Sequence, residues 1–256
     1  MGPHSTWFDF LPGFGGLKEK LHESLGRTWT WQVFQATSFE LAHVTGALLV
    51  LVFLWYGAAR YARAVGVSGD AGLVPPPKFG IRNLFETLAD TVLGLMAGVM
   101  GEKAAKRYLP LVGTFFLFIL FSNLLGLIPG FLPPTDTLKT NLALSVAVFV
   151  LTHVYGVREH GLKYFKHFLG PVWWLIPLML PIELISHIAR PVSLSMRLLG
   201  NIVADHKVVL VFFGIFAFVL PLPFMLMGVL VCVVQAVVFS LLTTVYISQA
   251  VAHEEH

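Results

Sequence analysis

The sequence predicts an all-α integral membrane protein with five membrane-crossing helices and one interfacial or re-entrant helix, the last two crossings being long and steeply tilted. Of its 256 residues, 56% are hydrophobic and 12% are charged, whereas about 25% of residues are charged in soluble domains. Apolar stretches recur along the chain at lengths close to the roughly 20 residues that a helix needs to span a bilayer. Composition and recurrence together predict a polytopic helical membrane domain.

Five apolar stretches are the predicted crossings, and they cover residues 41–59, 109–128, 141–156, 172–220 and 224–251. A sixth apolar stretch, residues 84–100, contains Glu86 and Asp90 and has basic residues on both sides. Both of its ends are therefore expected at the cytoplasmic face, and we predict that it lies along the membrane or re-enters it.

Basic residues near the ends of these stretches set the predicted orientation. The connection from Arg60 to Arg82 holds four basic residues against one acid, and the connection after Gly156 holds three against one. Cytoplasmic loops carry an excess of lysine and arginine, so we place both connections in the cytoplasm, the N-terminus outside and His256 inside. We expect an outer-side segment followed by a single membrane domain, with bounds at residues 1–39 and 40–256.

Arg197 lies deep within the stretch 172–220, where a charged side chain costs about 2.5–3.5 kcal/mol if it sits near a bilayer centre. At 100° per residue, Arg197 shares one helix face with five other residues, which together we call the polar stripe: Glu183, Ser186, Arg190, Ser193 and Asn201. Lipid cannot satisfy these groups, so the stripe is expected to face protein, water or a moving partner. Asp205 and His206 follow it and add titratable groups near the outer side.

The stretch that contains Arg197 is too long for an upright helix. A single helix over residues 181–210 would extend about 45 Å at 1.5 Å per residue, whereas the hydrocarbon core is about 30 Å thick. Fitting it would take a tilt of roughly 50°, against an average of about 20° for membrane helices. We therefore expect the first helix of the functional pair, within residues 172–251, to slant steeply or to break.

The last apolar stretch places Gln235, Tyr246 and Gln249 on one helix face, within about 40° of one another. Gln235 either meets the polar stripe or forms an ordinary hydrogen bond to a neighbouring helix, a contact worth about 0.6 kcal/mol. Position on a helical wheel does not choose between these two interpretations, and both stay open.

No cofactor, metal ion or nucleic acid is expected. Cys232 is the only cysteine, and the run His253-Glu254-Glu255-His256 lacks the spacing of the zinc motif H-E-x-x-H. His43 and His153 carry ring nitrogens that could hold a haem, but hydrogen-bonded packing is the favoured interpretation, and His187 lies beside the polar stripe. The basic residues lie at the ends of apolar stretches, which is typical of topology signals rather than of a nucleic-acid surface.

Several motifs carry a family resemblance. The run Arg197-Leu198-Leu199-Gly200-Asn201 follows Arg190-Pro191-Val192-Ser193-Leu194 and Glu183, and it precedes Gln235 and the C-terminal Ser248-Gln249-Ala250. A further run is Asn123-Leu124-Leu125-Gly126-Leu127-Ile128-Pro129. Together these motifs resemble subunit a of bacterial F-type ATP synthases, from about Phe79 onward. The combined pattern is highly specific, whereas Arg-Leu-x-Gly-Asn alone would be only suggestive.

The resemblance implies a non-catalytic stator that passes protons to and from a rotating ring of c subunits through two offset half-channels. Arg197 would face the ring carboxylates, favour their ionised form and block a direct proton leak. The positions that match the outer half-channel are Asn201, His206 and Gln235, and those that match the cytoplasmic half-channel are Glu183, Ser186, Arg190 and Ser193. The implied partners are the c ring, the b subunits of the peripheral stalk, protons and lipid, in the bacterial plasma (inner) membrane.

One position departs from the family pattern. The family often carries a second titratable residue on the last helix, at the position matching Gly228, and here that position has no side chain. Asp205 directly precedes His206 and could supply the missing acid to the outer half-channel, which we state as a hypothesis.

Two other classes of function compete with proton translocation. A passive membrane assembly scaffold would use the polar stripe only to dock a partner. An intramembrane redox enzyme or protease would need a haem or a nucleophile–base pair, and the sequence offers no recognisable pair. Replacing Arg197 separates translocation from scaffolding, because only a translocating subunit would lose proton coupling while the complex remains assembled.

Overall fold

The computed structural model describes residues 14–17, 20, 41–68, 80–128, 131–161, 164, 176–215 and 221–251. Its long helices are α2 (Leu41–Ser68), α3 (Ile81–Met100), α4 (Glu102–Gly126), α5 (Leu138–His160), α7 (Ile176–Ile215) and α8 (Pro221–Val251). A short 3₁₀ helix, η3 (Pro134–Asp136), lies between α4 and α5 in the chain. The regular elements described are all helical, which confirms the predicted class, while the predicted segment 1–39 falls almost wholly outside the described residues.

Apart from α7, the long helices extend beyond the apolar stretches that predicted them. α4 begins at Glu102 rather than at residue 109, and its first turns carry charged side chains that bond along the helix: Lys106 Nζ donates to Glu102 Oε1 over 2.6 Å. α5 likewise begins at Leu138 and ends at His160. Hydropathy marks only the part of a helix that suits lipid, whereas backbone hydrogen bonding continues into polar surroundings.

Four described helices are long and apolar enough to cross a membrane, over the spans His43–Arg63, Glu102–Gly126, Leu138–His160 and Pro223–Val251. These spans lie in α2, α4, α5 and α8 and agree with four of the five predicted crossings. α3 is not among them, and whether it lies along the membrane or re-enters it stays a prediction. Within the described residues α7 is not among them either, so the count of five crossings stays a prediction.

α3 and α4 form a tight helical hairpin around Gly101. α3 ends at Met100 and α4 begins at Glu102, with Gly101 at φ +79° between them. Residues that have a side chain rarely adopt that backbone conformation, whereas glycine does so readily. The Gly101 N–H still donates to the Ala97 carbonyl over 3.1 Å, so a single residue caps one helix and starts the next.

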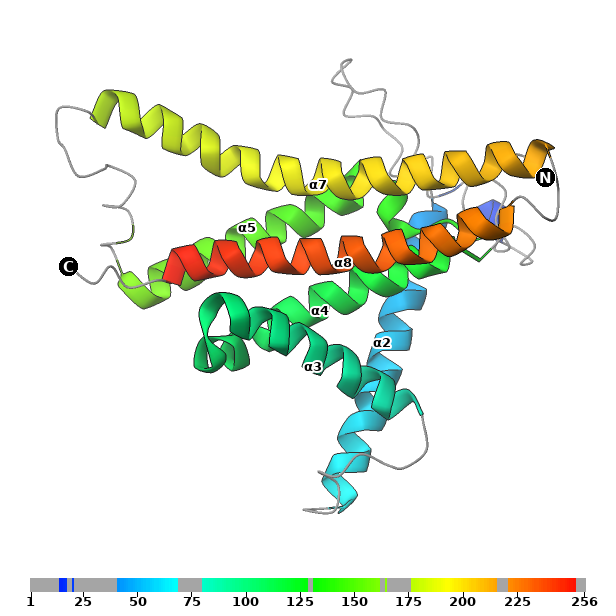
Figure 1. Cartoon of the computed structure of the whole chain (residues 1–256), viewed down its shortest axis with the longest axis horizontal. Coiled ribbons are helices and arrows are strands. Elements are labelled where there is room, and N and C mark those ends of the chain that lie inside the picture. The colour runs from blue at the N-terminus through cyan, green and yellow to red at the C-terminus, as the bar shows by residue number, and fades with distance from the viewer. Residues whose placement is uncertain are drawn as a thin grey trace.

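α7 and α8 run lengthwise beside each other, whereas α2 crosses their direction steeply (Figure 1). α8 is central in the bundle, because it packs against α3, α4, α5 and α7. α7 is a single helix of 40 residues, which at 1.5 Å per residue is about 60 Å long, roughly twice the hydrocarbon thickness. Pro181 and Pro191 lie inside α7 without ending it. Of the two arrangements expected for this helix, a break is therefore excluded over Ile176–Ile215, and a steep slant remains.

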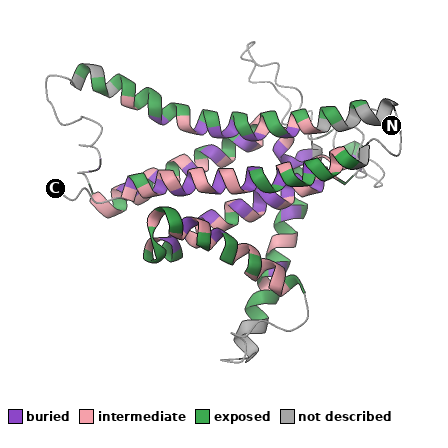
Figure 2. Cartoon of the chain, viewed as in Figure 1, coloured by how far each residue is buried: buried purple, intermediate pink, exposed green. Residues whose placement is uncertain are grey.

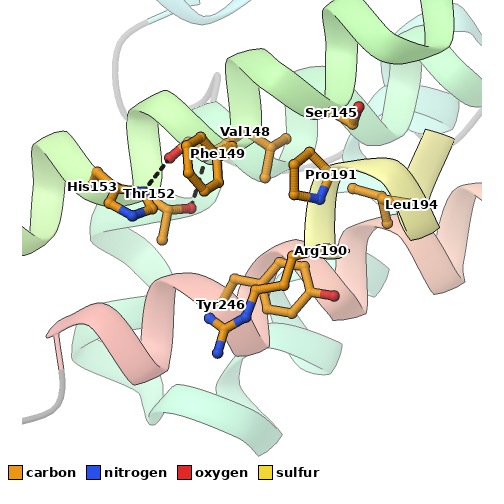
Figure 3. A pocket seen from close by; sticks show the side chains of 9 residues that line it. All are labelled: Ser145, Val148, Phe149, Thr152, His153, Arg190, Pro191, Leu194 and Tyr246. Carbon is orange, nitrogen blue, oxygen red and sulfur yellow. Dashed lines mark hydrogen bonds between the residues drawn. The ribbon is translucent and has the colours of Figure 1, made fainter. Parts of the chain in front are cut away.

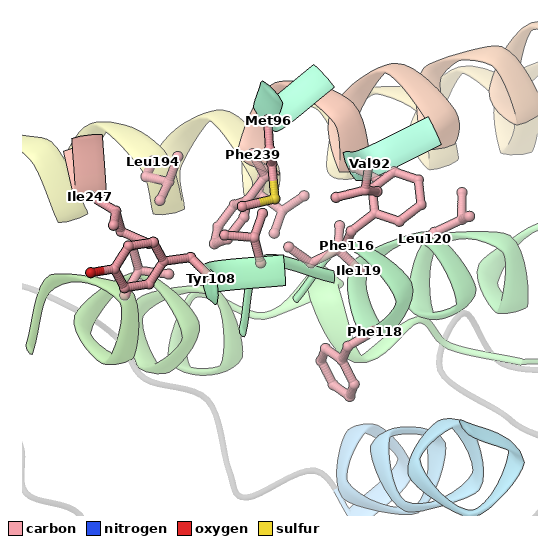
Figure 4. Packing of buried hydrophobic residues seen from close by; sticks show 14 of the residues in the cluster. Val92, Met96, Tyr108, Phe116, Phe118, Ile119, Leu120, Leu194, Phe239 and Ile247 are labelled. Atoms are coloured by element: carbon pink, nitrogen blue, oxygen red, sulfur yellow. The ribbon is translucent and has the colours of Figure 1, made fainter. Parts of the chain in front are cut away.

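The core lies where α3, α4, α7 and α8 meet (Figures 2 and 4). Large side chains from all four helices fill it, and none of the following is more than 1% exposed: Val92, Met96, Ile119, Leu198 and Ile247. Apolar side chains also cover the outer faces of the helices, where Leu226 is 74% and Ile185 is 67% exposed. Lipid is as apolar as a leucine side chain, so such outer faces are expected of a membrane bundle.

Candidate functional site

Arg197 lies near the middle of α7, on the border between the packed and the open surface of that helix. On the packed side, Leu194 is 3% and Leu198 is 1% exposed. These two leucines lie about 60° and 100° around the helix from Arg197, and Arg197 itself is exposed. The leucines therefore fix the position of this turn against the bundle, while the guanidinium remains outside the core.

The polar stripe runs along the same border of α7. Ser186, Ser193 and Asn201 are exposed, whereas Glu183 and Arg190 are half-buried. The outward surface of α7 is open over most of its length in this chain (Figure 2). Because lipid cannot satisfy serine, asparagine and arginine side chains, this surface suits contact with water or with another polar surface outside the chain.

Toward the C-terminal half of α7, polar side chains from three helices meet at a small cavity. Its lining combines Asn123 and Leu127 at the end of α4 with residues of α7 and α8, namely Ile202, Asp205, Val231, Cys232 and Gln235. The cavity volume is about 10 Å³, close to the smallest that holds one water molecule. Gln235 is only 7% exposed, so its amide is directed into the bundle.

Asp205 occupies the space beside Gly228. A Cβ atom added to Gly228 would lie 2.7 Å from Asp205 Oδ2 and 2.8 Å from Leu127 Cδ2. A side chain at position 228 and a carboxylate at position 205 therefore compete for the same volume. This contact is what the hypothesis of a relocated acid requires, because the acid on α7 reaches the place where the family often carries a titratable side chain on α8.

A buried hydrogen-bond network continues from this cavity toward η3. Thr135 Oγ1 donates to Asn123 Oδ1 over 2.7 Å, and Asn141 Nδ2 donates to the Thr135 carbonyl over 2.7 Å. Asn123 is 2% exposed, and Thr135 and Asn141 are both 0% exposed. Sequence reasoning missed Thr135 and Asn141, because neither lies on a recognisable polar face. Their only signal was position: Thr135 lies in the polar connection between two apolar stretches, and Asn141 is the first residue of the stretch 141–156.

A second cavity lies on the other side of Arg197, between α5, α7 and α8 (Figure 3). Its volume is also about 10 Å³, and its lining residues are Ser145, Val148, Phe149, Thr152, His153, Arg190, Pro191, Leu194 and Tyr246. Arg190 lies over the Tyr246 ring, with 5.2 Å from Cζ to the ring centroid, a cation–π contact. The stripe residue Arg190 is thus held by a side chain of α8.

Comparison with known proteins identifies the family. A family model described as ATP synthase A chain matches residues 41–248. The chain belongs to this family. It is 50% identical over 208 residues to ATP synthase subunit a 2 of Syntrophotalea carbinolica, covering 81% of this chain and 85% of that protein. It is 48% identical over 238 residues to subunit a 1 of the same organism, covering 90% and 97%. It is 49% identical over 177 residues to subunit a of Geobacter sulfurreducens, covering 69% and 76%.

Membership of the ATP synthase A chain family makes this chain a non-catalytic, proton-translocating component of the membrane sector. The interpretation as an intramembrane redox enzyme or protease is therefore set aside. The family supplies no atomic contacts for this chain, so the roles of individual side chains rest on the geometry described above.

In this ATP synthase A chain, the predicted site residues separate into three places. Asp205 and Gln235 share the cavity near Gly228, Arg190 and Tyr246 share the second cavity, and Arg197 lies on the open border between them. The side chain of His206 lies outside the described residues.

The histidines considered for a haem are bonded to backbone carbonyls. His43 Nδ1 lies 3.2 Å from the Pro133 oxygen, and His153 Nδ1 lies 2.8 Å from the Phe149 oxygen. Both rings are therefore oriented by a backbone carbonyl of the same bundle. In the part of the chain that the structure describes, no group of three or more His, Cys, Asp or Glu side chains could hold a metal ion.

Proposed function

We propose that this chain is the stator subunit that carries protons to and from a rotating ring of c subunits through two offset half-channels, with Arg197 facing the ring carboxylates. The observation that carries the proposal is the arrangement of α7: an exposed arginine stands between two small cavities, each of which is lined in part by polar side chains. Arg190 lies seven residues before Arg197 and Asp205 lies eight residues after it. At 1.5 Å per residue, the cavities are therefore offset from Arg197 by roughly 10 Å and 12 Å in opposite directions.

The charge of Arg197 explains how protons can be transferred through two cavities that are not joined to each other. A guanidinium stays protonated in essentially any environment, and an adjacent cation favours the ionised form of a carboxyl group. A ring carboxylate that reaches Arg197 releases its proton on one side and takes up another only after it has moved past. The same fixed cation opposes the direct passage of a proton along α7, so rotation becomes the available route.

The cavity near Gly228 belongs to the outer half-channel in this proposal. Asp205 and Gln235 line it together with Asn123, and Asn201 and His206 extend it along α7. Asp205 acts there as the acid that position 228 lacks. The cytoplasmic half-channel uses the other end of the stripe, whose members are Glu183, Ser186, Arg190 and Ser193.

The fold suits a slanted pair of helices beside a rotor. α2 carries a span of 21 residues, from His43 to Arg63, which at 1.5 Å per residue is about 32 Å and close to the hydrocarbon thickness. With α2 near the membrane normal, α7 and α8 slant steeply (Figure 1). We further propose the bacterial inner membrane, an outer N-terminus, a cytoplasmic C-terminus, and contacts with the c ring and the b subunits of the peripheral stalk.

The decisive experiment replaces Arg197 in the assembled ATP synthase. We expect Arg197→Ala to reduce gradient-driven ATP synthesis in membrane vesicles to background while the amount of assembled complex stays at the wild-type level. Arg197→Lys should also fail, because a lysine can lose its proton where a guanidinium does not.

A matched control is Arg60→Ala. Arg60 is an exposed arginine of α2 whose Nη1 donates to Tyr56 Oη over 3.3 Å, and its loss should leave synthesis near the wild-type rate. If the chain were a passive scaffold, Arg197→Ala would reduce the amount of assembled complex, and the complex that remained would couple normally. That outcome would reject translocation through Arg197.

A further inference from the structure

Two histidines from different helices meet next to Glu183. The rings of His153 on α5 and His187 on α7 have centroids 5.4 Å apart and an interplanar angle of 71°. His187 is 8% exposed, and His153 also lines the cavity that contains Arg190. The pair therefore connects a buried position beside Glu183 with the cavity of the polar stripe.

Backbone hydrogen bonds fix which nitrogen of each ring can take up a proton. His187 Nδ1 lies 3.0 Å from the Glu183 carbonyl oxygen, and His153 Nδ1 lies 2.8 Å from the Phe149 carbonyl oxygen. A carbonyl only accepts hydrogen bonds, so in the neutral rings Nδ1 carries the hydrogen and Nε2 is the basic nitrogen. Both rings thus keep one proton-accepting nitrogen while their orientation is held by their own helices.

Charges of both signs surround the pair. His187 Nδ1 lies 3.4 Å from Glu183 Oε1, which favours the imidazolium form, whereas Arg190, three residues further along the same helix face, opposes it. Among the described residues, the other titratable neighbours are Tyr164, whose ring centroid is 5.8 Å from that of His153, and Tyr246, whose ring lies against Arg190. Imidazole is the side chain that ordinarily changes charge between pH 5 and 8, so a pair of imidazoles among these groups is suited to proton exchange.

We propose that His187, together with His153, is a further proton-translocating site of the cytoplasmic half-channel. This inference rests on the proposed function and extends it to two residues outside the polar stripe. His187 takes up a proton at Nε2 and forms an imidazolium–carboxylate pair with Glu183. It returns the proton from the same nitrogen, so one N–H bond forms and breaks and no other reactant is needed. His153 links this site to the cavity at Arg190.

Packing alone gives no reason for two imidazoles at this contact. Two apolar side chains would fill the same space between α5 and α7. Each imidazole instead adds a ring nitrogen that can take up a proton.

The test measures proton transfer as a function of cytoplasmic pH. In inverted membrane vesicles that contain the complete ATP synthase, we expect His187→Gln to slow ATP-driven proton pumping about tenfold at neutral pH, which is less than the roughly 10²–10⁴-fold effect of a positioned acid–base group at a reacting centre. The step in the wild-type pH profile between pH 5 and 8 should disappear or move. His153→Gln should change the same step in the same direction with a smaller loss of rate.

The matched control is His43→Gln, because His43 is a buried histidine whose Nδ1 also bonds a backbone carbonyl, that of Pro133. It should leave the pH profile unchanged. The proposal is overturned if the two cavity-side variants keep the wild-type profile, or if they lose only assembled complex, which would indicate a packing role. Arg197→Ala distinguishes failure of the proposed function from failure of the histidine proposal. If the proposed function is wrong, Arg197→Ala keeps its activity. If only the histidine proposal is wrong, Arg197→Ala is still inactive.

Discussion

At the scale of single residues, the contact between Asp205 and Gly228 has the clearest functional consequence. The missing side chain on α8 and the carboxylate on α7 are two halves of one arrangement, because a Cβ at Gly228 would lie 2.7 Å from Asp205 Oδ2. Gln235 and Asn123 complete the same cavity. One acid fits this volume as it stands, whereas a side chain at position 228 would require Asp205 and Leu127 to move.

We expect Asp205→Asn to lower gradient-driven ATP synthesis by about tenfold, since it removes a group that exchanges protons and keeps the shape of the side chain. The measurement is ATP synthesis in vesicles at equal complex content. Moving the acid should recover part of the rate: in Gly228→Asp combined with Asp205→Gly, the contact with Asp205 is removed and only the Leu127 side chain has to shift. An unchanged rate in Asp205→Asn would rule out Asp205 as a proton-exchanging residue.

At the scale of elements, the three-residue helix η3 is held by buried polar contacts from its neighbours. It contacts α2, α4, α5 and α7. Thr135 bonds both Asn123 and Asn141, and the Pro133 carbonyl bonds His43 of α2. A connection that hydropathy marks only as a polar loop thus fixes the relative positions of three helix ends near the cavity beside Gly228.

Removing the Thr135 hydroxyl should weaken this junction. Thr135→Val keeps the shape of the side chain but leaves Asn123 Oδ1 without that donor, and a buried polar group that loses its partner costs about 1–3 kcal/mol. We expect a lower thermal unfolding midpoint of the purified complex in detergent. Thr114→Val is the control, because the exposed Thr114 hydroxyl bonds only the Pro110 carbonyl of its own helix. Equal midpoints for both variants would contradict a stabilising role of the network.

At the scale of the whole molecule, the exposed surface of α7 and the position of α8 define how the chain presents its site. α3, α4, α5 and α7 all pack against α8, so α8 holds α7 at the edge of the bundle, with the polar stripe along the border between packed and open surface. The excess of basic residues in the connections after α2 and α5 predicts which face of this bundle is cytoplasmic. That orientation places Lys139 outside and Arg158 in the cytoplasm.

The two ends of α5 offer a direct test of this orientation. Lys139 and Arg158 are both exposed and lie near opposite ends of the same helix, while the natural Cys232 is only 6% exposed and should give little background. A membrane-impermeant maleimide should label Lys139→Cys in intact spheroplasts and Arg158→Cys in inverted vesicles. The reverse labelling pattern would show that the predicted orientation is wrong.

Sequence patterns determined those features that depend on one helix alone. Hydropathy predicted the helical membrane class and four spans that the structure contains, and the 100° spacing of α7 placed Arg197 on one face with Glu183 and Asn201. The length of the apolar stretch required a slanted or broken helix. These features follow from local backbone geometry and from transfer into lipid, both of which act on consecutive residues.

Only the tertiary structure decided which faces meet. It brought Asp205 against Gly228, joined Asn123 to Thr135 across the polar connection, and set His153 beside His187. It also chose a continuous α7 over a broken one, despite Pro181 and Pro191. The physical reason is that helical periodicity fixes the direction of a side chain within its own helix, whereas its partner depends on how distant helices pack.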